Sequence, residues 1–203
     1  MTKYTFYILL LSFSLQSCAQ DNLSLYDFKL GDHIDAMKDI DLEQKGNEKY
    51  EDSHIYRFET PYKNDISLTF VEDKLVFIEE DYLYKNDYTT SLENFEFEKT
   101  KFIDVKNKFD SKGFIYSDRN AGQAGDLFYT LICYKIKNTD QVIVFGSTLP
   151  IDELEDIKGQ EELWSKISLS TIILAQENYL DSIWGDEKKH PDNDNYKIDL
   201  NKI

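Results

Sequence analysis

The clearest pattern in the chain is an alternation of apolar and polar residues with a period of two. Residues 66–71 alternate in this way, and the polar turn 72–74 separates them from the apolar run 75–78. In a strand, successive side chains point to opposite faces, so this pattern predicts a β-hairpin with one buried face. Residues 55–58 predict a preceding strand.

Helical periodicity marks two other segments. After Gly31 and Asp32, which suit a helix start, Ile34, Met37 and Ile40 recur every three residues and predict a short helix. A second helix is predicted where the apolar residues of 100–109 share one helical face; these are Phe102, Val105 and Phe109.

The second helix introduces another round of strands. Residues 114–116 predict a strand, and 127–136 with 142–145 predict a second hairpin across the polar stretch 137–141. Helix, strand and hairpin thus follow one another twice, in possible repeats 28–84 and 95–149.

The segment from Pro150 to Gly185 predicts a long C-terminal helix, 151–184, or two helices divided at Gly159. Four acidic residues at its start suit the positive end of a helix dipole. An apolar stripe follows, made of Leu154, Ile157, Trp164, Ile167, Thr171, Leu174 and Tyr179. The fold class we predict is α+β: an antiparallel sheet from two helix-plus-three-strand repeats, packed by helices including this one.

The N-terminus has the pattern of an export signal. One lysine precedes residues 4–15, which carry no charge. About twelve apolar residues are too few for a transmembrane helix, which needs roughly 20. Leu15-Gln16-Ser17-Cys18 follows, and this resembles the lipobox of bacterial lipoproteins. The resemblance implies removal of signal peptide 1–17 and acylation of Cys18, for example with palmitate.

Ala19 follows the cysteine where an aspartate favours inner-membrane retention in Gram-negative lipoproteins, so the resemblance implies the outer membrane of the cell envelope. We predict a lipidated tether at 18–27, one domain at 28–185 and a polar tail at 186–203. The predicted repeats and residues 30–32 weakly resemble β-lactamase-inhibitor-like and small outer-membrane-assembly lipoprotein folds, whose members bind other proteins.

Composition narrows the class of partner. The chain has 39 acidic and 23 basic residues, and removing residues 1–17 takes away one lysine, which leaves a net charge of −17. This charge repels nucleic acid and favours basic proteins or cations. About 185 residues with 14% aromatics in the whole chain suffice for one folded domain. Lipidation of Cys18 leaves Cys133 without a partner for a disulfide, and its apolar neighbours predict a buried, inert thiol.

The candidate catalytic and binding motifs each lack a required residue. His33, His54 and His190 are far apart without a zinc-binding pattern, and residues 192–195 lack the glycine and glutamate of a calcium loop. Residues 121–125 lack the Lys-Ser/Thr of a phosphate loop, and we predict a mobile link there. Residues 146–148 lack the second glycine of a nucleophile elbow. Glu79, Glu80 and Asp81 alternate between faces, which favours a solvated strand end over paired catalytic acids. We predict no catalytic, metal-binding or cofactor-binding residues and no cofactor.

Several functions remain open at this stage. The leading hypothesis is a non-enzymatic, lipid-anchored protein-binding module, such as an acidic inhibitor or immunity protein that binds a basic envelope protein. The alternative is a lipoprotein that binds a small molecule, sugar or calcium between the sheet and the C-terminal helix. A third hypothesis is a hydrolase that uses scattered acidic residues.

Overall fold

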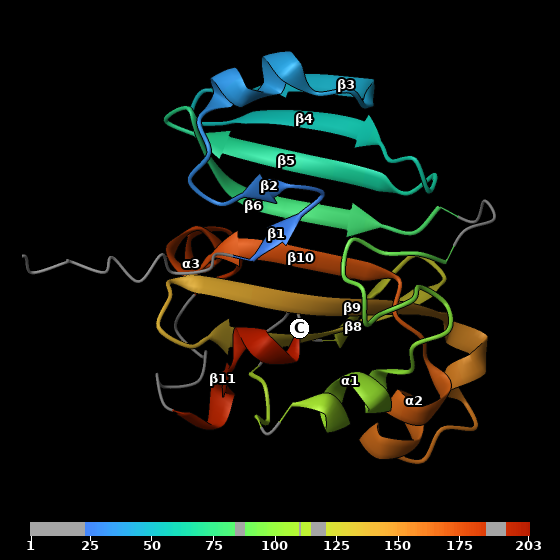
Figure 1. Cartoon of the computed structure of the whole chain (residues 1–203). Coiled ribbons are helices and arrows are strands. Elements are labelled where there is room, and N and C mark those ends of the chain that lie inside the picture. The colour runs from blue at the N-terminus through green and yellow to red at the C-terminus, as the bar shows by residue number, and fades with distance from the viewer. Residues whose placement is uncertain (1–22, 84–87, 110, 115–120, 186–193) are drawn as a thin grey trace, which may run out of the picture.

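A single large sheet organises the protein. The computed structural model describes residues 23–83, 88–109, 111–114, 121–185 and 194–203. Within these residues the sheet has the strand order β11-β8-β9-β10-β6-β5-β4-β3, and β7 pairs with β8 (Figure 1). Its strands are β3 (Glu43–Lys49), β4 (His54–Glu59), β5 (Asp65–Val71), β6 (Lys74–Asp81), β7 (Ala121–Ala124), β8 (Leu127–Ile136), β9 (Gln141–Pro150), β10 (Thr171–Gln176) and β11 (Lys197–Ile198).

Both predicted hairpins are present. The hairpin of β5 and β6 turns at Glu72 and Asp73, whose φ angles of 49° and 60° are those of a two-residue turn that matches the twist of its strands. The hairpin of β8 and β9 turns after Ile136, and β9 continues to Pro150, beyond its predicted end. The predicted strand at 55–58 is confirmed as β4. The predicted helix at 100–109 is confirmed as α1 (Phe102–Lys108), with Phe102 and Val105 buried.

The long C-terminal helix predicted at 151–184 is wrong. This segment contains the 3₁₀ helix η2 (Ile151–Leu154), the short helix α2 (Gln160–Lys166), the strand β10 and the helix α3 (Glu177–Trp184). β10 is central and buried on both faces, so its apolar residues are consecutive and also fit a helical stripe. The β-branched Thr171, Ile172 and Ile173 favour the strand.

The two predicted helix-plus-three-strand repeats are also wrong, and the protein is mainly sheet. The first half contributes four strands, β3 to β6, where three were predicted. β10 then pairs with β6 on one side and β9 on the other, and so joins the two hairpins. Two strand edges that would otherwise be unpaired gain hydrogen-bonding partners in this way, which is the physical reason for the insertion.

The sheet is not purely antiparallel, because β11 pairs parallel to β8. β11 belongs to the segment 186–203 predicted as a polar tail. Residues 186–193 lie outside the described part, but from Asp194 the chain packs on the domain: Ile198 is buried, and the amide of Asn94 donates to the carbonyl oxygen of Ile203 at 2.7 Å. The tail prediction is therefore wrong from Asp194 onward.

The tether prediction for 18–27 also requires correction. Residues 18–22 lie outside the described part, but β1 (Ser24–Leu25) and β2 (Phe28–Lys29) form a hairpin and Leu25 is fully buried. The predicted helix at Ile34–Ile40 follows as a 3₁₀ helix, η1 (Ile34–Asp39). The mobile link predicted at 121–125 is instead strand β7, paired with β8.

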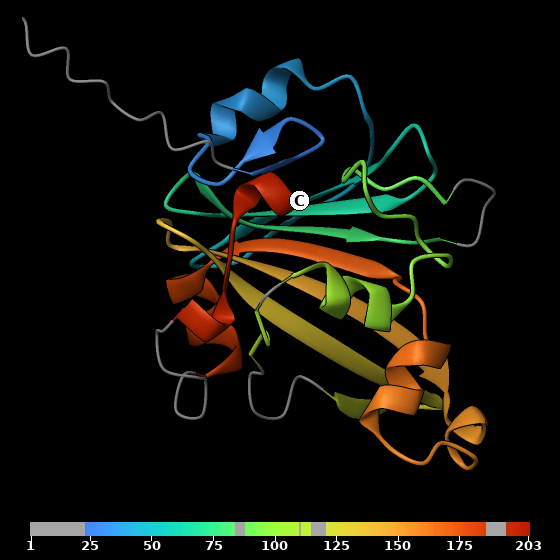
Figure 2. The same cartoon turned by 60° about the horizontal axis from the view of Figure 1, so that its bottom comes forward.

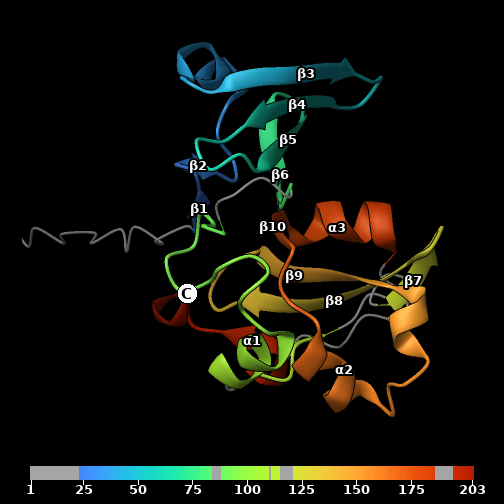
Figure 3. The same ribbon diagram turned by 90° about the vertical axis from the view of Figure 1, so that its right-hand side faces the viewer.

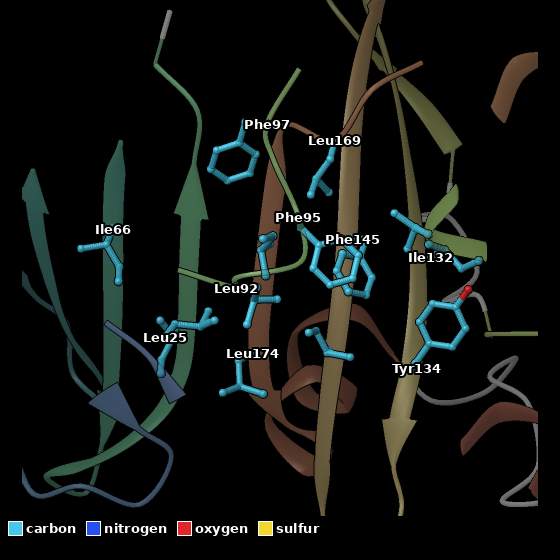
Figure 4. Close-up of a cluster of buried hydrophobic side chains, with 14 of the residues drawn as sticks. Leu25, Ile66, Leu92, Phe95, Phe97, Ile132, Tyr134, Phe145, Leu169 and Leu174 are labelled. Carbon is cyan, nitrogen blue, oxygen red and sulfur yellow. The ribbon is translucent and has the colours of Figure 1, made fainter. Parts of the chain in front are cut away.

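The sheet separates two hydrophobic clusters of unequal size. The larger cluster is covered by β1 and β2, residues 92–97, α1 and α2, and includes Ile66, Phe145 and Leu174 (Figures 2 and 4). The smaller cluster lies on the opposite face under α3, whose Leu180 is buried. Figure 3 shows α3 on one side of β8, β9 and β10, with α1 and α2 on the other. On this face, α3 does not cover part of β4, β5 and β6.

Candidate functional site

Three carboxyl groups of β5 and β6 share the face that carries α3. Asp65 lies directly opposite Asp81 in the strand register, and Glu79 shares their face because it precedes Asp81 by two residues. Thr171 of β10 lies on the other side of Asp81, and its hydroxyl donates to the Asp81 carboxylate at 2.7 Å. We call Asp65, Glu79 and Asp81 the acidic group.

The environment of Glu79 and Asp81 favours protonated carboxyls. Burial raises the pKa of Glu79 to about 8, with a further contribution from the negative charge of Asp81, while the Arg57 guanidinium acts in the opposite direction. Burial also raises the pKa of Asp81, with the charge of Asp65 adding to it and the hydrogen bond from Thr171 opposing it. The pair Glu79 and Asp81 therefore retains a proton at a pH where exposed carboxyls are ionised.

We expect Glu79→Gln to stabilise the protein at high pH. The folded-state pKa of about 8 lies above the usual 4.5, so wild-type stability should fall as pH rises between these values. After allowance for partial solvent exposure, the variant should gain about 1–2 kcal/mol near pH 8 and nothing near pH 4.5. Urea unfolding at both pH values measures this. Glu93→Gln, at an exposed glutamate, is the control, and an equal gain in both variants would refute the assignment to Glu79.

Glu80, between the two, points into the opposite face and is fully buried. One carboxylate oxygen accepts from the amide of Asn64 at 3.0 Å, and the other accepts from the Ser91 backbone N–H at 3.1 Å and the Ser91 hydroxyl at 2.6 Å. Burial raises the pKa of Glu80, and the hydrogen bonds from Ser91 and Asn64 oppose this. Glu80 thus connects β6 to the β4–β5 turn and to residues 89–91, which is a structural role.

The solvated strand end predicted at Glu79, Glu80 and Asp81 is wrong for Glu80, which is fully buried. The predicted alternation of faces is correct, since Glu80 lies opposite to Glu79 and Asp81. Residues two apart in a strand share a face, so Glu79 and Asp81 form a pair of acidic side chains that was not predicted. Asp65 was also missed, although the hairpin turn at 72–73 fixes the register that places it opposite Asp81.

The other candidate residues do not join this group. His33 caps η1, and His54 contacts Asn47 and lies with its ring centroid 4.4 Å from that of Tyr56, tilted by 34°. Cys133 is buried, as predicted, and Ser147 donates to the carbonyl oxygen of Ser168. Cys18, His190, Asp192 and Asn193 lie outside the described residues, and in the part that is described no cluster of three or more His, Cys, Asp or Glu could hold a metal ion.

The cavity beside Asp81 is small. It has a volume of about 180 Å³ and is lined by Asp81, Tyr82, Glu98, Thr148, Ser170 and Thr171. Pockets that enclose a small organic ligand usually have about 300–1,000 Å³. The acidic group can hold a proton and create a negative potential at the surface of the sheet, but this cavity does not enclose a substrate next to it.

No known family model, curated protein or solved structure matches this chain. Its function must therefore be argued from its own residues. None of the helices in the described ranges has the length and apolar character that crossing a membrane requires.

Proposed function

We propose that the chain is a lipid-anchored protein of the cell envelope, placed in the outer membrane, that acts as a non-enzymatic binding module for a basic protein. The observation that carries the anchor is the lipobox Leu15-Gln16-Ser17-Cys18 directly after an uncharged run. Two or more acyl chains hold a protein on a membrane, since each buried methylene contributes about 0.8 kcal/mol. The proposed anchor is inferred from residues 4–18 alone.

The excess of acidic residues supports a basic partner. Thirty-nine acids against 23 bases create a negative field that attracts positively charged proteins and speeds their association. An inhibitor or immunity protein that binds a basic toxin or enzyme would have this character.

The distance between the anchor and the domain is short. The described chain begins at Leu23, five residues after Cys18, and five residues span at most about 18 Å when fully extended. A lipid on Cys18 would therefore hold the β1–β2 hairpin near the membrane surface. Partners would approach a domain that stands close to the bilayer.

We expect the wild-type chain, expressed with its native signal in a bacterial host, to partition into the membrane with the mass of a diacylated or triacylated Cys18. Cys18→Ala removes the thiol that accepts the lipid and should lose both properties. Intact-mass spectrometry and membrane fractionation measure this. An unmodified wild-type protein in the soluble fraction would refute the anchor.

Partner binding has a separate test. Membranes that carry the wild-type protein should recover a basic envelope protein at low salt and release it at high salt, because screening weakens surface charge attraction. Recovery of no protein at low salt would contradict the binding role. A rise in melting temperature with calcium or a sugar, in the absence of any protein, would favour the ligand-binding alternative.

A further inference from the structure

A cavity of about 390 Å³ lies between the N-terminal hairpin, η1 with the residues that follow it, and Pro61 of the β4–β5 turn. The turn Tyr26–Asp27 of the hairpin forms one wall, η1 and the residues after it form another, and Pro61 closes the end. The lining is completed by Phe28, Asp32, Ala36, Ile40, Asp41 and Leu42. We call this cavity the N-terminal pocket.

The side chains of the inner part of the N-terminal pocket are apolar, and packing against the larger hydrophobic cluster holds them in place. Phe28 is buried in the larger hydrophobic cluster, and Ile40 and Leu42 pack against that cluster. The ring of Tyr26 lies 6.2 Å from that of Tyr62. Because these side chains belong to the packed core, the floor does not need to form when a ligand arrives.

The rim of the N-terminal pocket is acidic. Asp27, Asp32 and Asp41 line it, whereas its lining contains no lysine, arginine or histidine. Asp27 and Asp41 are exposed, and no ion pair between described residues includes any of the three aspartates. Asp32 is held in place, since its carboxylate accepts from the backbone N–H of Lys29 at 2.9 Å.

Lysine and arginine side chains have the matching chemistry. Their methylene stems lie along apolar surface while the charged head stays in contact with water or with carboxylates. The N-terminal pocket offers an apolar floor for the stem and carboxylates at the rim for the head. A phosphate or another anion would be repelled by the same aspartates.

We propose that the N-terminal pocket receives a lysine or arginine side chain of the basic partner, and so deepens the proposed function on which it rests. The pocket belongs to the hairpin nearest the lipid anchor, so a partner docked there would approach along the membrane surface. The acidic group on the α3 face lies on the other side of the sheet and is not part of this pocket.

The probe for this proposal is the dipeptide analogue Nα-acetyl-arginine methylamide, compared with its citrulline counterpart. Citrulline has nearly the same shape as arginine but no charge. In methyl NMR of the full chain in non-ionic detergent, the arginine probe should shift the methyl signals of Ala36, Ile40 and Leu42 saturably. The citrulline probe should cause much smaller shifts.

Asp27→Asn combined with Asp41→Asn should weaken binding of the arginine probe roughly three- to tenfold, since exposed charge pairs each contribute modestly. Glu51→Gln with Asp52→Asn is the matched control, because it removes two exposed acids from the larger cavity of about 480 Å³ near Tyr50. This control should bind the probe as the wild type does.

The outcomes separate the two proposals. Equal shifts with both probes, shifts spread over methyls far from the pocket, or equal weakening in the control variant would overturn the pocket assignment. If the wild type recovers a basic partner but the Asp27 and Asp41 variant recovers it equally well, the proposed function stands and the pocket assignment fails. If the probe binds in the pocket but no protein is recovered at low salt, the proposed function fails, and the pocket is a site for an arginine-like cation that does not belong to a protein partner.

Discussion

Ile172→Ala and Ile173→Ala should each lower the free energy of unfolding by about 2–4 kcal/mol, although the two residues are neighbours. Ile172 is fully buried in the larger hydrophobic cluster, while Ile173 is 2% exposed and belongs to the smaller cluster on the opposite face. Each substitution leaves a cavity in a different core. Chemical denaturation of the purified variants measures both losses.

A residue of the following helix is the control for this pair. Ile183 of α3 is 41% exposed, so Ile183→Ala should change stability by less than about 0.5 kcal/mol. A large loss for only one of the two neighbours would indicate burial on one face alone, as in an amphipathic helix or a half-exposed strand. That result would contradict the central position of β10. The two losses should add in the double variant only in part, because adjacent residues share backbone shifts.

Glu80→Ala should destabilise the protein by about 3 kcal/mol. The change leaves the backbone N–H and hydroxyl of Ser91 without their acceptor in the interior and removes one of the two acceptors of the Asn64 amide. An orphaned buried donor costs about 1–3 kcal/mol. The variant should also exchange the amide hydrogen of Ser91 faster, because its bond to Glu80 holds that segment on β6.

Glu80→Gln separates the hydrogen bonds from the charge. Glutamine retains one acceptor oxygen of similar reach and should lose less than alanine, most clearly at high pH. Burial raises the pKa of Glu80, so the wild type loses stability as pH rises through that raised value, and the variant does not. Glu93→Ala, at an exposed position of the neighbouring segment, controls for the loss of a surface acid. Equal stability of Glu80→Ala and wild type would show that the network contributes nothing.

Glu80, which bonds to Asn64 and Ser91, also lies close to a residue of the N-terminal pocket. Tyr26 lines the N-terminal pocket, and burial raises the pKa of the Tyr26 hydroxyl, with a further contribution from the charge of Glu80. The φ angles of Tyr26 and Asp27 are 51° and 66°, conformations that non-glycine residues adopt rarely, so packing around Tyr26 must hold the turn. Loss of Glu80 should therefore disturb the pocket as well as the core.

Local patterns in the sequence predicted the elements that depend mainly on contacts between residues close together in the sequence. The hairpin of β5 and β6 alternates with a period of two and has a polar turn, and α1 has its apolar residues at helical spacing. These signals follow from the geometry of a single strand or helix with one buried face. The lipobox-like residues 15–18 are likewise a local signal, from which we predict the anchor.

The C-terminal third shows where local pattern is ambiguous. Ile167, Thr171 and Leu174 have the spacing of a helical stripe, yet Thr171 and Leu174 lie in β10, and Ile167 is the extended C-cap residue after α2. A strand buried on both faces has no alternation by which to recognise it. The β-branched residues of this segment favour a strand, and pairing with the edges of β6 and β9, which lie far apart in the sequence, fixes it as one.

The sequence by itself determined the signal-like N-terminus, the negative charge, both hairpins and α1, because each depends on composition or on contacts between near neighbours. The tertiary structure decided the place of β10, the packing of β11 and the burial of Glu80, because these depend on which distant segments pair. It also brought Asp65 opposite Asp81 and placed Asp27 and Asp41 around one pocket. Such groupings arise only when strand register and long-range packing are fixed together.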